Sequence, residues 1–456
     1  MSATATPAAP RAGAALPPGP RLPKPVATAL FVARRDVLLG RLREKHGDAF
    51  TVDLPIFGRT VVVSSPELVK QVFTASPDTL VFGEDSPLGK VLGPGSLFSL
   101  DGQRHLRERR LLLPPFHGAR MKSYEGIIEE ETLRETARWR EGEELATLEP
   151  FMRITLNAIL RAVFGAHGPQ QQRLAELLPR FVTLGSKLAL LPWLHHDLGP
   201  RSPWGKLMRG RAVYDRIIDE LIDTALADPE LEERADVLAL LVQANYEDGS
   251  AMSRTAIADE LLTLLAAGHE TTATSLAWAV ERLRRHPDLL ERLTAEADAG
   301  GNALRAATIW EVQRTRPVIV GTSRKVKAES FPLGEWQIPK DHRIMVGARL
   351  IHNDARFFDR PRSFEPDRFL DRKPDTYTWV PFGGGTRRCI GAAFAHMEMD
   401  VVLRTLLRAF EIAPTTEQGE AWQSRGIAFA PAEGGRAIVR RRAATPAPLV
   451  EAPAAA

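Results

Sequence analysis

Segments that favour β-strands lie only near the two ends of this chain of 456 residues, and nearly everything between them favours α-helix. Two runs of β-branched residues between turn signals occur early, at residues 49–55 and 59–65. Two more occur late, at 334–339 and 342–348. Strands so far apart in sequence indicate a small mixed sheet beside a helical body, so the predicted fold class is mainly α with a small β region.

The longest helical segment runs from Ser253, a candidate N-cap, to Pro287, which should stop it. Residues 266–272 are small and polar within this otherwise apolar helix. The Thr271 hydroxyl can bond to a carbonyl one turn earlier, and a locally opened turn would leave a notch for a ligand or water. Glu270 supplies a carboxylate for moving protons. The alternative is a simple packing notch beside a solvated glutamate.

Balanced charge and a single cysteine exclude several kinds of function. The chain has 60 Lys and Arg against 57 Asp and Glu, which argues against nucleic acid as a partner. One cysteine excludes an internal disulfide, a Cys-x-x-Cys zinc site and a cluster held by four thiolates, so we expect a reducing compartment. We find neither a secretory signal nor the roughly 20 consecutive apolar residues of a membrane span, so we expect a cytoplasmic protein.

Composition also predicts the domain organisation. Residues 1–22 are rich in Ala and Pro and should form a disordered arm, and residues 443–456 should form a similar tail. Between them no linker-like composition and no internal repeat interrupts the chain. We therefore expect one domain over residues 23–442.

The only cysteine lies in an unusual loop. Glycines at 383–385 and at Gly391 allow positive φ and close approach of the backbone to a ligand. Cys389 lies near the start of a helix, beside Arg387 and Arg388, and both influences favour the thiolate. An anionic sulfur in such a loop is a metal ligand or a nucleophile. No further ligands are spaced for zinc, and no Lys-Ser/Thr follows as in a phosphate-binding P-loop.

Two further patterns of charge are less specific. Glu311 and Arg314 are three residues apart on a helix and should form an ion pair, which Arg368 in a proline-punctuated loop could join. His105 and Arg109 lie one helical turn apart and suit an anionic ligand such as a carboxylate. Each pattern is also compatible with solvated surface features.

Taken together, these residues resemble a known family. Phe382, Gly385, Arg387, Cys389 and Gly391 reproduce the Phe-x-x-Gly-x-Arg-x-Cys-x-Gly signature of the cytochromes P450, the haem-thiolate monooxygenases. Three weaker motifs occur in the family's order and cover nearly all of the chain between residues 17 and 442. They are the oxygen-activation motif at 267–271, the paired Glu311-x-x-Arg314 motif, and the loop at 364–369.

The resemblance implies the cytochrome P450 fold, with haem b (iron protoporphyrin IX) between the long central helix and the helix that follows the cysteine loop. Cys389 would be the axial ligand, and its thiolate would favour O–O cleavage. Thr271 and Glu270 would deliver protons. The other implied roles are haem contacts by His105, Arg109, Ala267, Gly268, Arg324, Phe382, Arg387 and Gly391, and a structural network of Glu311, Arg314 and Arg368.

The implied reaction inserts one oxygen atom of O2 into a lipophilic small molecule, with Ala267, Thr271, Val318 and Val320 as pocket walls. Residues 82–99 should form a lid. Electrons would come from a separate ferredoxin and reductase, so NAD(P)H would act only indirectly, and the protein should be a monomer. The basic residues expected to steer the acidic carrier are Arg107, Arg110, Arg372 and Lys373.

Other functions remain open at this stage. A haem-thiolate peroxygenase or a rearranging enzyme would keep the cofactor without consuming O2, and a non-catalytic haem-binding or lipid-binding protein would lack the reaction. Two departures from the family concern the fold alone. Residues 288–310 are shorter than the family's usual connecting helices and are interrupted by glycines. Asp341 occupies a position where relatives often have glycine.

Overall fold

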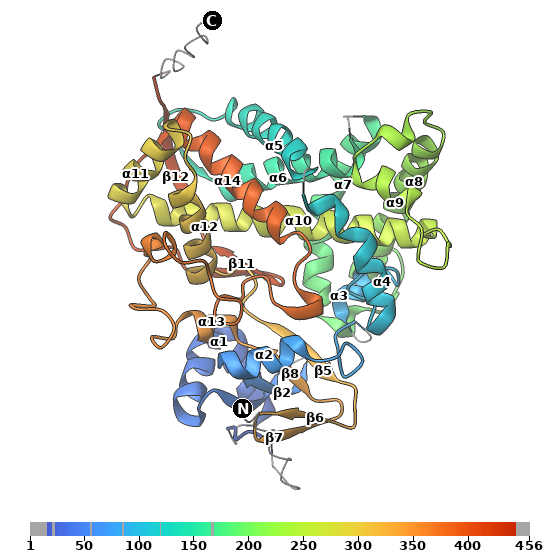
Figure 1. The fold of residues 1–456 in the computed structure, drawn as a ribbon, viewed down its shortest axis with the longest axis vertical. Helices are drawn as coiled ribbons and strands as arrows, with labels where there is room; N and C mark the ends of the chain where they lie inside the picture. The colour runs from blue at the N-terminus through green and yellow to red at the C-terminus, as the bar shows by residue number, and fades with distance from the viewer. Residues whose placement is uncertain are drawn as a thin grey trace, which may run out of the picture.

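The computed structural model describes residues 16–20, 23–54, 57–83, 86–118, 120–165 and 168–443. A large body of helices stands over a small sheet, which lies with the first helices at the bottom of the view in Figure 1. The helices are α1 (Lys24–His46), α2 (Pro66–Thr74), α3 (Pro87–Leu92), α4 (Gly102–Leu112), α5 (Arg120–Thr136), α6 (Leu148–Phe164), α7 (Pro169–Ala189), α8 (Pro203–Leu226), α9 (Val237–Gln243), α10 (Arg254–Leu283), α11 (Pro287–Asp298), α12 (Ala303–Thr315), α13 (Ala348–His352) and α14 (Ala392–Ala409).

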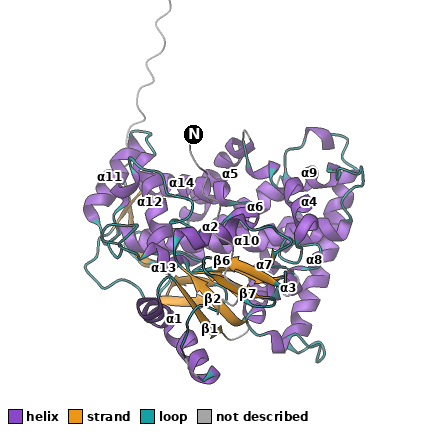
Figure 2. Cartoon of the chain, turned by 60° about the horizontal axis from the view of Figure 1, so that its bottom comes forward, coloured by secondary structure: helices purple, strands orange, loops and turns teal. Residues whose placement is uncertain are grey.

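The main sheet joins the two ends of the chain, as predicted. Its strand order is β1-β2-β8-β5-β3, with β2 and β8 parallel and the other pairs antiparallel. Figure 2 shows these strands gathered on one side of the helical body. The strands of the protein are β1 (Ala49–Leu54), β2 (Gly58–Val63), β3 (Leu80–Val81), β4 (Glu144–Ala146), β5 (Thr322–Val326), β6 (Ser330–Leu333), β7 (Trp336–Pro339), β8 (Arg343–Val346), β9 (Phe410–Ile412), β10 (Trp422–Arg425), β11 (Ala428–Pro431) and β12 (Arg436–Arg441).

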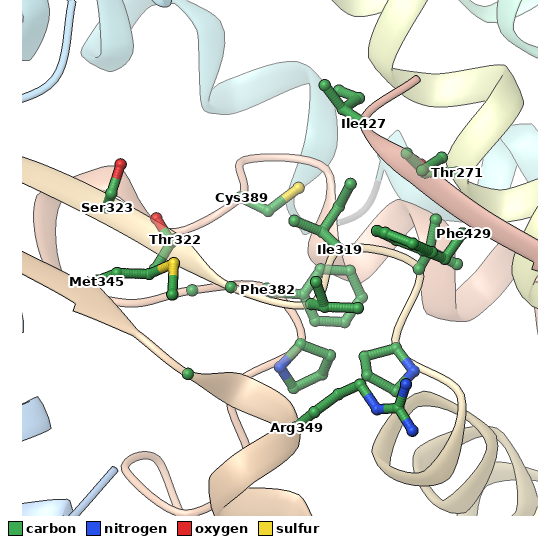
Figure 3. A pocket seen from close by; sticks show the side chains of 18 of the residues that line it. Thr271, Ile319, Thr322, Ser323, Met345, Arg349, Phe382, Cys389, Ile427 and Phe429 are labelled. Atoms are coloured by element: carbon green, nitrogen blue, oxygen red, sulfur yellow. The ribbon is translucent and has the colours of Figure 1, made fainter. Parts of the chain in front are cut away.

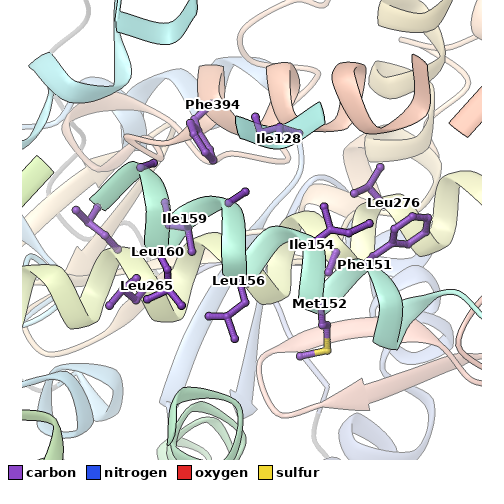
Figure 4. Close-up of a cluster of buried hydrophobic side chains, with 14 of the residues drawn as sticks. Ile128, Phe151, Met152, Ile154, Leu156, Ile159, Leu160, Leu265, Leu276 and Phe394 are labelled. Atoms are coloured by element: carbon purple, nitrogen blue, oxygen red, sulfur yellow. The ribbon is translucent and has the colours of Figure 1, made fainter. Parts of the chain in front are cut away.

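Helices α6 and α10 pack together at the centre of the helical body. Both are apolar around most of their circumference, which is typical of helices buried on all sides. Their side chains interlock in a large core to which α5 and α14 add Ile128 and Phe394 (Figure 4). Ile154 and Leu265 are completely buried there. This rigid layer fixes the position of α10.

The ends of α10 follow the predicted signals. The Ser253 side chain accepts a hydrogen bond from the backbone N–H of Ala256, so the predicted N-cap is confirmed. The helix ends at Leu283, and Pro287 begins α11 rather than continuing α10. Residues 288–310 form most of two regular helices, α11 and α12, with a short turn between them. Asp341 has a φ of 65°, which explains why glycine suits that position.

The N-terminal segment differs from the prediction at residues 16–20. Thr51 of β1 donates its backbone N–H to the carbonyl of Pro18 at 2.9 Å and its hydroxyl to that of Pro17 at 2.7 Å. This stretch therefore packs beside β1 instead of belonging to a disordered arm. The rest of the predicted arm, residues 1–15 and 21–22, and the tail from residue 444 lie outside the described residues. Within the described part of the chain, no helix is long and apolar enough to cross a bilayer.

Candidate active site

A cavity of about 1380 Å³ lies between α10 and the loop that precedes α14. Cys389 reaches it from the loop and Thr271 from α10, and both side chains point toward it in Figure 3. The four residues predicted as pocket walls, Ala267, Thr271, Val318 and Val320, all line this cavity. Segments more than 100 residues apart in sequence thus meet at one site.

The loop before Cys389 is shaped by contact with α2. Gly385 has a φ of +64°, and a Cβ there would lie 1.9 Å from the backbone oxygen of Phe73. A Cβ on Gly384 would lie 2.1 Å from the Phe73 ring. Glycine is therefore required at both positions. The backbone N–H of Cys389 donates to the carbonyl of Phe382 at 3.0 Å, which closes the loop and turns the sulfur toward the cavity.

The environment of the Cys389 sulfur corrects one expectation. Burial raises the pKa of this thiol, and the opposing effects of the Gly391 amide, Arg109 and Arg388 are smaller. The Gly391 amide and Arg388 do favour the thiolate, as expected, but desolvation outweighs them. Coordination to a metal ion deprotonates a thiol outright, so a metal ion bound here would give the thiolate.

Cationic side chains surround the same end of the cavity. His105 and Arg109 from α4, Arg324 from β5 and Arg387 from the cysteine loop all line it. Arg324 donates to the Thr322 hydroxyl at 3.0 Å and to the Ser323 carbonyl at 2.8 Å.

Arg387 is held by the lid segment. It donates to the carbonyl of Leu97 at 2.8 Å and also bonds the Leu100 carbonyl and Asp101. Asp101 is the N-cap residue of α4, the helix that carries His105 and Arg109. The cysteine loop and the start of α4 are thereby joined through one ion pair.

These cations are not balanced by carboxylates. Among the described residues, Arg324 and Arg387 share one acidic group, Asp101, and Arg109 interacts with the Cys389 sulfur rather than with a carboxylate. Burial and the charge of Arg387 lower the pKa of Arg324 to about 9, and burial lowers the pKa of Arg387 to about 10. Burial and the neighbouring arginines lower the pKa of His105 to about 3, and its buried Nδ1 has no hydrogen-bond partner. The surroundings thus favour an anionic ligand.

Thr271 and Glu270 lie on adjacent faces of α10. The Thr271 hydroxyl donates to the carbonyl of Ala267 at 2.7 Å, the predicted contact, while the helix continues without interruption. Glu270 is buried, and its carboxylate lies 3.5 Å from the guanidinium of Arg425. Burial raises the pKa of Glu270, and Arg425 opposes this rise. Glu270 therefore holds its proton more firmly than an exposed carboxyl does.

Gly268 does not line the cavity. A Cβ there would lie 3.4 Å from the side chain of Ile159, so this glycine allows close packing of α10 against α6. The small residue predicted to contact a cofactor thus faces the neighbouring helix instead. Phe382 does line the cavity, and its ring also packs against His396 of α14 with 5.2 Å between the ring centroids.

Glu311, Arg314 and Arg368 form the predicted network behind the cysteine loop. Arg314 makes two hydrogen bonds of 2.7 Å with the carboxylate of Glu311, and both side chains have 0% exposure. Arg368 joins the same carboxylate at 3.3 Å. The other donors of Arg314 reach the carbonyls of His352, Pro361 and Ser363.

The hairpin of β10 and β11 supplies residues that sequence reasoning missed. Its tip places Ile427 and Phe429 in the cavity and Arg425 beside Glu270. Gly426 at the turn has a φ of +83°. A glycine between the mostly polar run at 422–425 and the apolar run at 427–431 was the available signal, but the runs are too short to be recognised as strands.

The predicted lid and the predicted partner-binding residues have definite contacts. The lid segment contains α3 and is held by hydrogen bonds from Gly95 to Asp259 of α10 at 2.7 Å and from Arg211 of α8 to the Leu92 carbonyl at 2.9 Å. Arg107 pairs with Asp248, and Arg110 pairs with Glu247. Arg372 and Lys373 are exposed.

This fold and site define an enzyme class built around one thiol in a glycine loop, facing a helix that carries an acid and an alcohol. Comparison with known proteins identifies the class. The family model "Cytochrome P450" matches residues 17–434. A Mycobacterium tuberculosis (strain ATCC 25618 / H37Rv) protein named "Putative cytochrome P450 138" is 54% identical over 428 residues, covering 94% of this chain and 97% of that protein.

A second relative and two solved structures agree. "Putative cytochrome P450 137" of Mycobacterium tuberculosis (strain CDC 1551 / Oshkosh) is 38% identical and covers 88% of this chain and 84% of its own. The structure described as "Retinoic acid bound cyanobacterial CYP120A1" has a TM-score of 0.81 at 23% identity, covering 94% of this chain and 100% of its own. "Crystal structure of cytochrome P450DA heme domain" gives 0.80 at 22% identity, covering 94% and 98%. The chain belongs to the cytochrome P450 family and is a haem monooxygenase.

The residues of the cavity fit a haem. A single thiol faces an apolar cavity, and a metal ion bound to it would hold it as the thiolate. The surplus of cations at the same end, with the unpartnered Nδ1 of His105, matches a group that carries carboxylates. Both requirements are met at the same end of one cavity.

Proposed function

We propose that this protein hydroxylates a lipophilic small molecule with O2 and with electrons that a ferredoxin supplies. In this reaction O2, two electrons and two protons convert a C–H bond to C–OH and release one water molecule. NAD(P)H would be used only by the reductase of that ferredoxin. The observation that carries the proposal is the thiol of Cys389 facing the acid–alcohol pair of α10 across an apolar cavity.

The cofactor in this proposal is haem b, with Cys389 as the ligand of its iron. When bound, it supplies the activation of O2 and the transfer of one oxygen atom. Arg109, Arg324 and Arg387 would hold its carboxylates, because their charges exceed those of the protein's own acids at this end of the cavity. The neutral ring of His105 would donate a hydrogen bond from its unpartnered Nδ1. The amide of Gly391 would stabilise negative charge on the sulfur.

Proton supply is assigned to Glu270 and Thr271. Burial raises the pKa of Glu270, so this carboxyl holds its proton more firmly than an exposed glutamate does and can act as a proton donor toward the cavity. Its partner Arg425 also lies 4.0 Å from Glu149, which is 63% exposed, so charged groups lead from the solvent to the buried acid. The Thr271 hydroxyl would present a proton at Oγ1 to the cavity and exclude loosely held water.

The walls of the cavity favour a lipophilic substrate. Val318, Ile319, Phe429 and Ile427 contribute apolar surface between the hairpin and α10. The lid segment closes one side with Phe82 and Phe98, whose ring centroids are 6.0 Å apart. Such a site gains affinity mainly from the apolar area that the substrate buries.

A ferredoxin-type donor is the remaining part of the proposal. Arg372 and Lys373 are exposed and can attract an acidic carrier. Arg107 and Arg110 contribute less, since Asp248 and Glu247 already compensate their charges. The described residues contain no cluster that could hold a metal centre for electron storage within this chain, which leaves the electrons to a separate protein.

Replacing Thr271 by Ala tests the function directly. With a surrogate ferredoxin and reductase, we expect O2 uptake to continue while product formed per electron falls about 100-fold, the lower end of the 10²–10⁴-fold that a positioned proton donor typically contributes. Thr271→Ser should retain most of the coupling. Product formed only with added peroxide, and not with reductase and O2, would instead identify a peroxygenase.

A further inference from the structure

A second group of arginines lines the same cavity away from Cys389. Arg35 comes from α1, Arg316 follows α12, and Arg349 belongs to α13. Figure 3 shows Arg349 at the opposite end of the view from Thr271, with Ile319 and Phe429 between them. These cations are therefore distinct from the group around His105 and Arg324.

The three guanidiniums gather around two rings of the β10–β11 hairpin. Arg349 lies 4.0 Å and Arg316 5.8 Å from the centre of the Trp422 ring. Arg35 lies 5.1 Å from the centre of the Phe429 ring, and the two ring centres are 6.2 Å apart. Stacking on aromatic faces fixes the planes of the guanidiniums but leaves their edges available for hydrogen bonds.

Their donors are only partly used. The Nε atoms of Arg35, Arg316 and Arg349 are all buried without a hydrogen-bond partner among the described residues. Arg349 pairs with Asp36 through one Nη, and Arg316 donates to the carbonyl of Thr315 at 3.0 Å. Buried donors in native proteins are normally satisfied, so three such atoms in one place indicate a missing acceptor.

The nearby carboxylates do not fill this role. Glu281 is bound by Arg282, by Arg285 at 3.1 Å, and by the backbone N–H of Glu420 at 2.8 Å. Asp36 is the only acidic group that acts on Arg35 and Arg349 in the described chain, and Arg316 interacts with Glu281, whose carboxylate the partners above already share. Burial lowers the pKa of each of the three arginines, and burial together with the charge of Arg282 lowers that of Arg316 to about 10.

We propose that Arg35, Arg316 and Arg349 bind the carboxylate of the substrate, an apolar carboxylic acid such as a fatty acid. The guanidinium fork matches a carboxylate, and burial of the pair away from bulk water strengthens the contact. The apolar body of the molecule then lies along Ile319 and Phe429 toward Thr271 and Cys389. This inference rests on the proposed function and specifies its substrate class.

The arrangement also sets where the substrate is oxidised. When the arginines hold the carboxylate, the methyl end of the fatty-acid chain lies nearest to Cys389. Oxidation is therefore expected at carbons remote from the carboxylate and not at the carbons next to it.

Binding of dodecanoic acid and of dodecan-1-ol to the purified haem-loaded protein tests the inference. The two molecules share one carbon chain and differ in charge. Affinities are measured by equilibrium dialysis, which needs no turnover, and by the shift in haem absorption. We expect the acid to bind at least about tenfold more tightly than the alcohol, since hydrogen bonds to charged groups contribute roughly 1.5–3 kcal/mol.

Three arginine-to-glutamine variants and one lysine variant locate the preference. Arg316→Gln and Arg349→Gln should each reduce the preference for the acid about fivefold or more, and leave the affinity for the alcohol within about twofold. Arg173→Gln is the matched control, because it removes an arginine from an exposed pair with Glu220. Thermal unfolding of each variant verifies that it folds, and Arg316→Lys should keep part of the preference.

The outcomes separate the inference from the proposed function. Equal affinity for acid and alcohol in the unaltered protein overturns the inference, whether or not the enzyme oxidises lipids. A preference that survives both arginine variants, or a product oxidised beside the carboxylate, also overturns it. Selective binding of the acid that is lost in the arginine variants supports the inference, even if no oxygenated product forms and the proposed function fails.

Discussion

The protein has two buried groups of charged side chains near the cysteine loop, and they differ in whether every charge has a partner within the protein. In the network of Glu311, Arg314 and Arg368, the two fully buried members have all their charges and donors paired within the protein. Around the cavity, the guanidiniums of Arg109 and Arg324 exceed the available carboxylates. A complete network stabilises the fold, whereas an incomplete one indicates a partner that the polypeptide does not provide.

The largest effect is expected at Cys389, the residue proposed to bind the iron of the haem. Cys389→Ala removes the only thiol in the chain and should abolish product formation and the thiolate character of the ferrous carbon monoxide spectrum. The fold should survive, because the Glu311 network does not involve the sulfur. Absorption spectra test the loss of the thiolate ligand, and thermal unfolding tests whether the fold survives. Retention of the thiolate spectrum would show that another residue ligates the iron.

Breaking the complete network should destabilise the whole protein. Arg314→Ala removes the guanidinium that makes both 2.7 Å hydrogen bonds with the fully buried Glu311 and leaves only Arg368, at 3.3 Å, as its cationic partner. It should lower the free energy of unfolding by about 3–5 kcal/mol. Urea unfolding measures the change. The control is Arg292→Ala, which removes an arginine from an exposed pair with Asp367 and should cost about 0–1 kcal/mol. Equal losses of unfolding free energy in Arg314→Ala and Arg292→Ala would show that the buried network stabilises the fold no more than an exposed ion pair does.

A single buried acid on α14 extends the comparison to pH. Both carboxyl oxygens of Glu398 are buried, and neither makes a hydrogen bond of normal geometry with a described residue. Burial raises the pKa of Glu398 to about 8, and the nearby Thr272 hydroxyl offsets only a small part of this rise. The folded protein thus keeps this proton well above pH 4.5, the group's ordinary pKa, while the unfolded chain releases it there.

Stability should therefore fall as the pH rises between those two values, by at most about 1.4 kcal/mol per pH unit from this group. Glu398→Gln removes the titrating proton and should flatten this part of the pH dependence. Urea unfolding of both proteins from pH 5 to pH 8 measures the difference. A slope that is the same in both proteins would mean that the pKa of Glu398 is not raised.

Local spacing explains which features the sequence could predict. Ser253 caps the helix that follows it, and Glu311 pairs with Arg314 three residues later, because each contact is set within one helical turn. The four strands of the two chain ends were predicted from their composition. The glycine requirement of the cysteine loop also has a local signal, although its cause, the contact with Phe73, lies in α2.

Tertiary contacts explain what the sequence could not predict. The pKa of Cys389 depends on burial, which no local pattern reports, and burial outweighs the neighbouring arginines. Gly268 packs against Ile159 of a distant helix, and Arg425 reaches Glu270 from a hairpin more than 150 residues later. Hydrophobic periodicity predicts that an element exists, but not which remote element will lie beside it.

The smallest effect concerns one cation of the incomplete group. Arg324→Gln removes a guanidinium whose charge has no carboxylate of its own, so the polypeptide should lose little stability, in contrast to Arg314→Ala. Haem should dissociate about tenfold faster, since a hydrogen bond to a charged group contributes roughly 1.5–3 kcal/mol. Transfer of haem to an excess of a scavenging protein measures the rate, with Arg173→Gln as the control for loss of one positive charge. The contrary result would be a loss of unfolding free energy in Arg324→Gln as large as that in Arg314→Ala, with an unchanged rate of haem release. Arg324 would then stabilise the fold as the Glu311 network does, and the surplus of charge around the cavity would have no ligand to explain it.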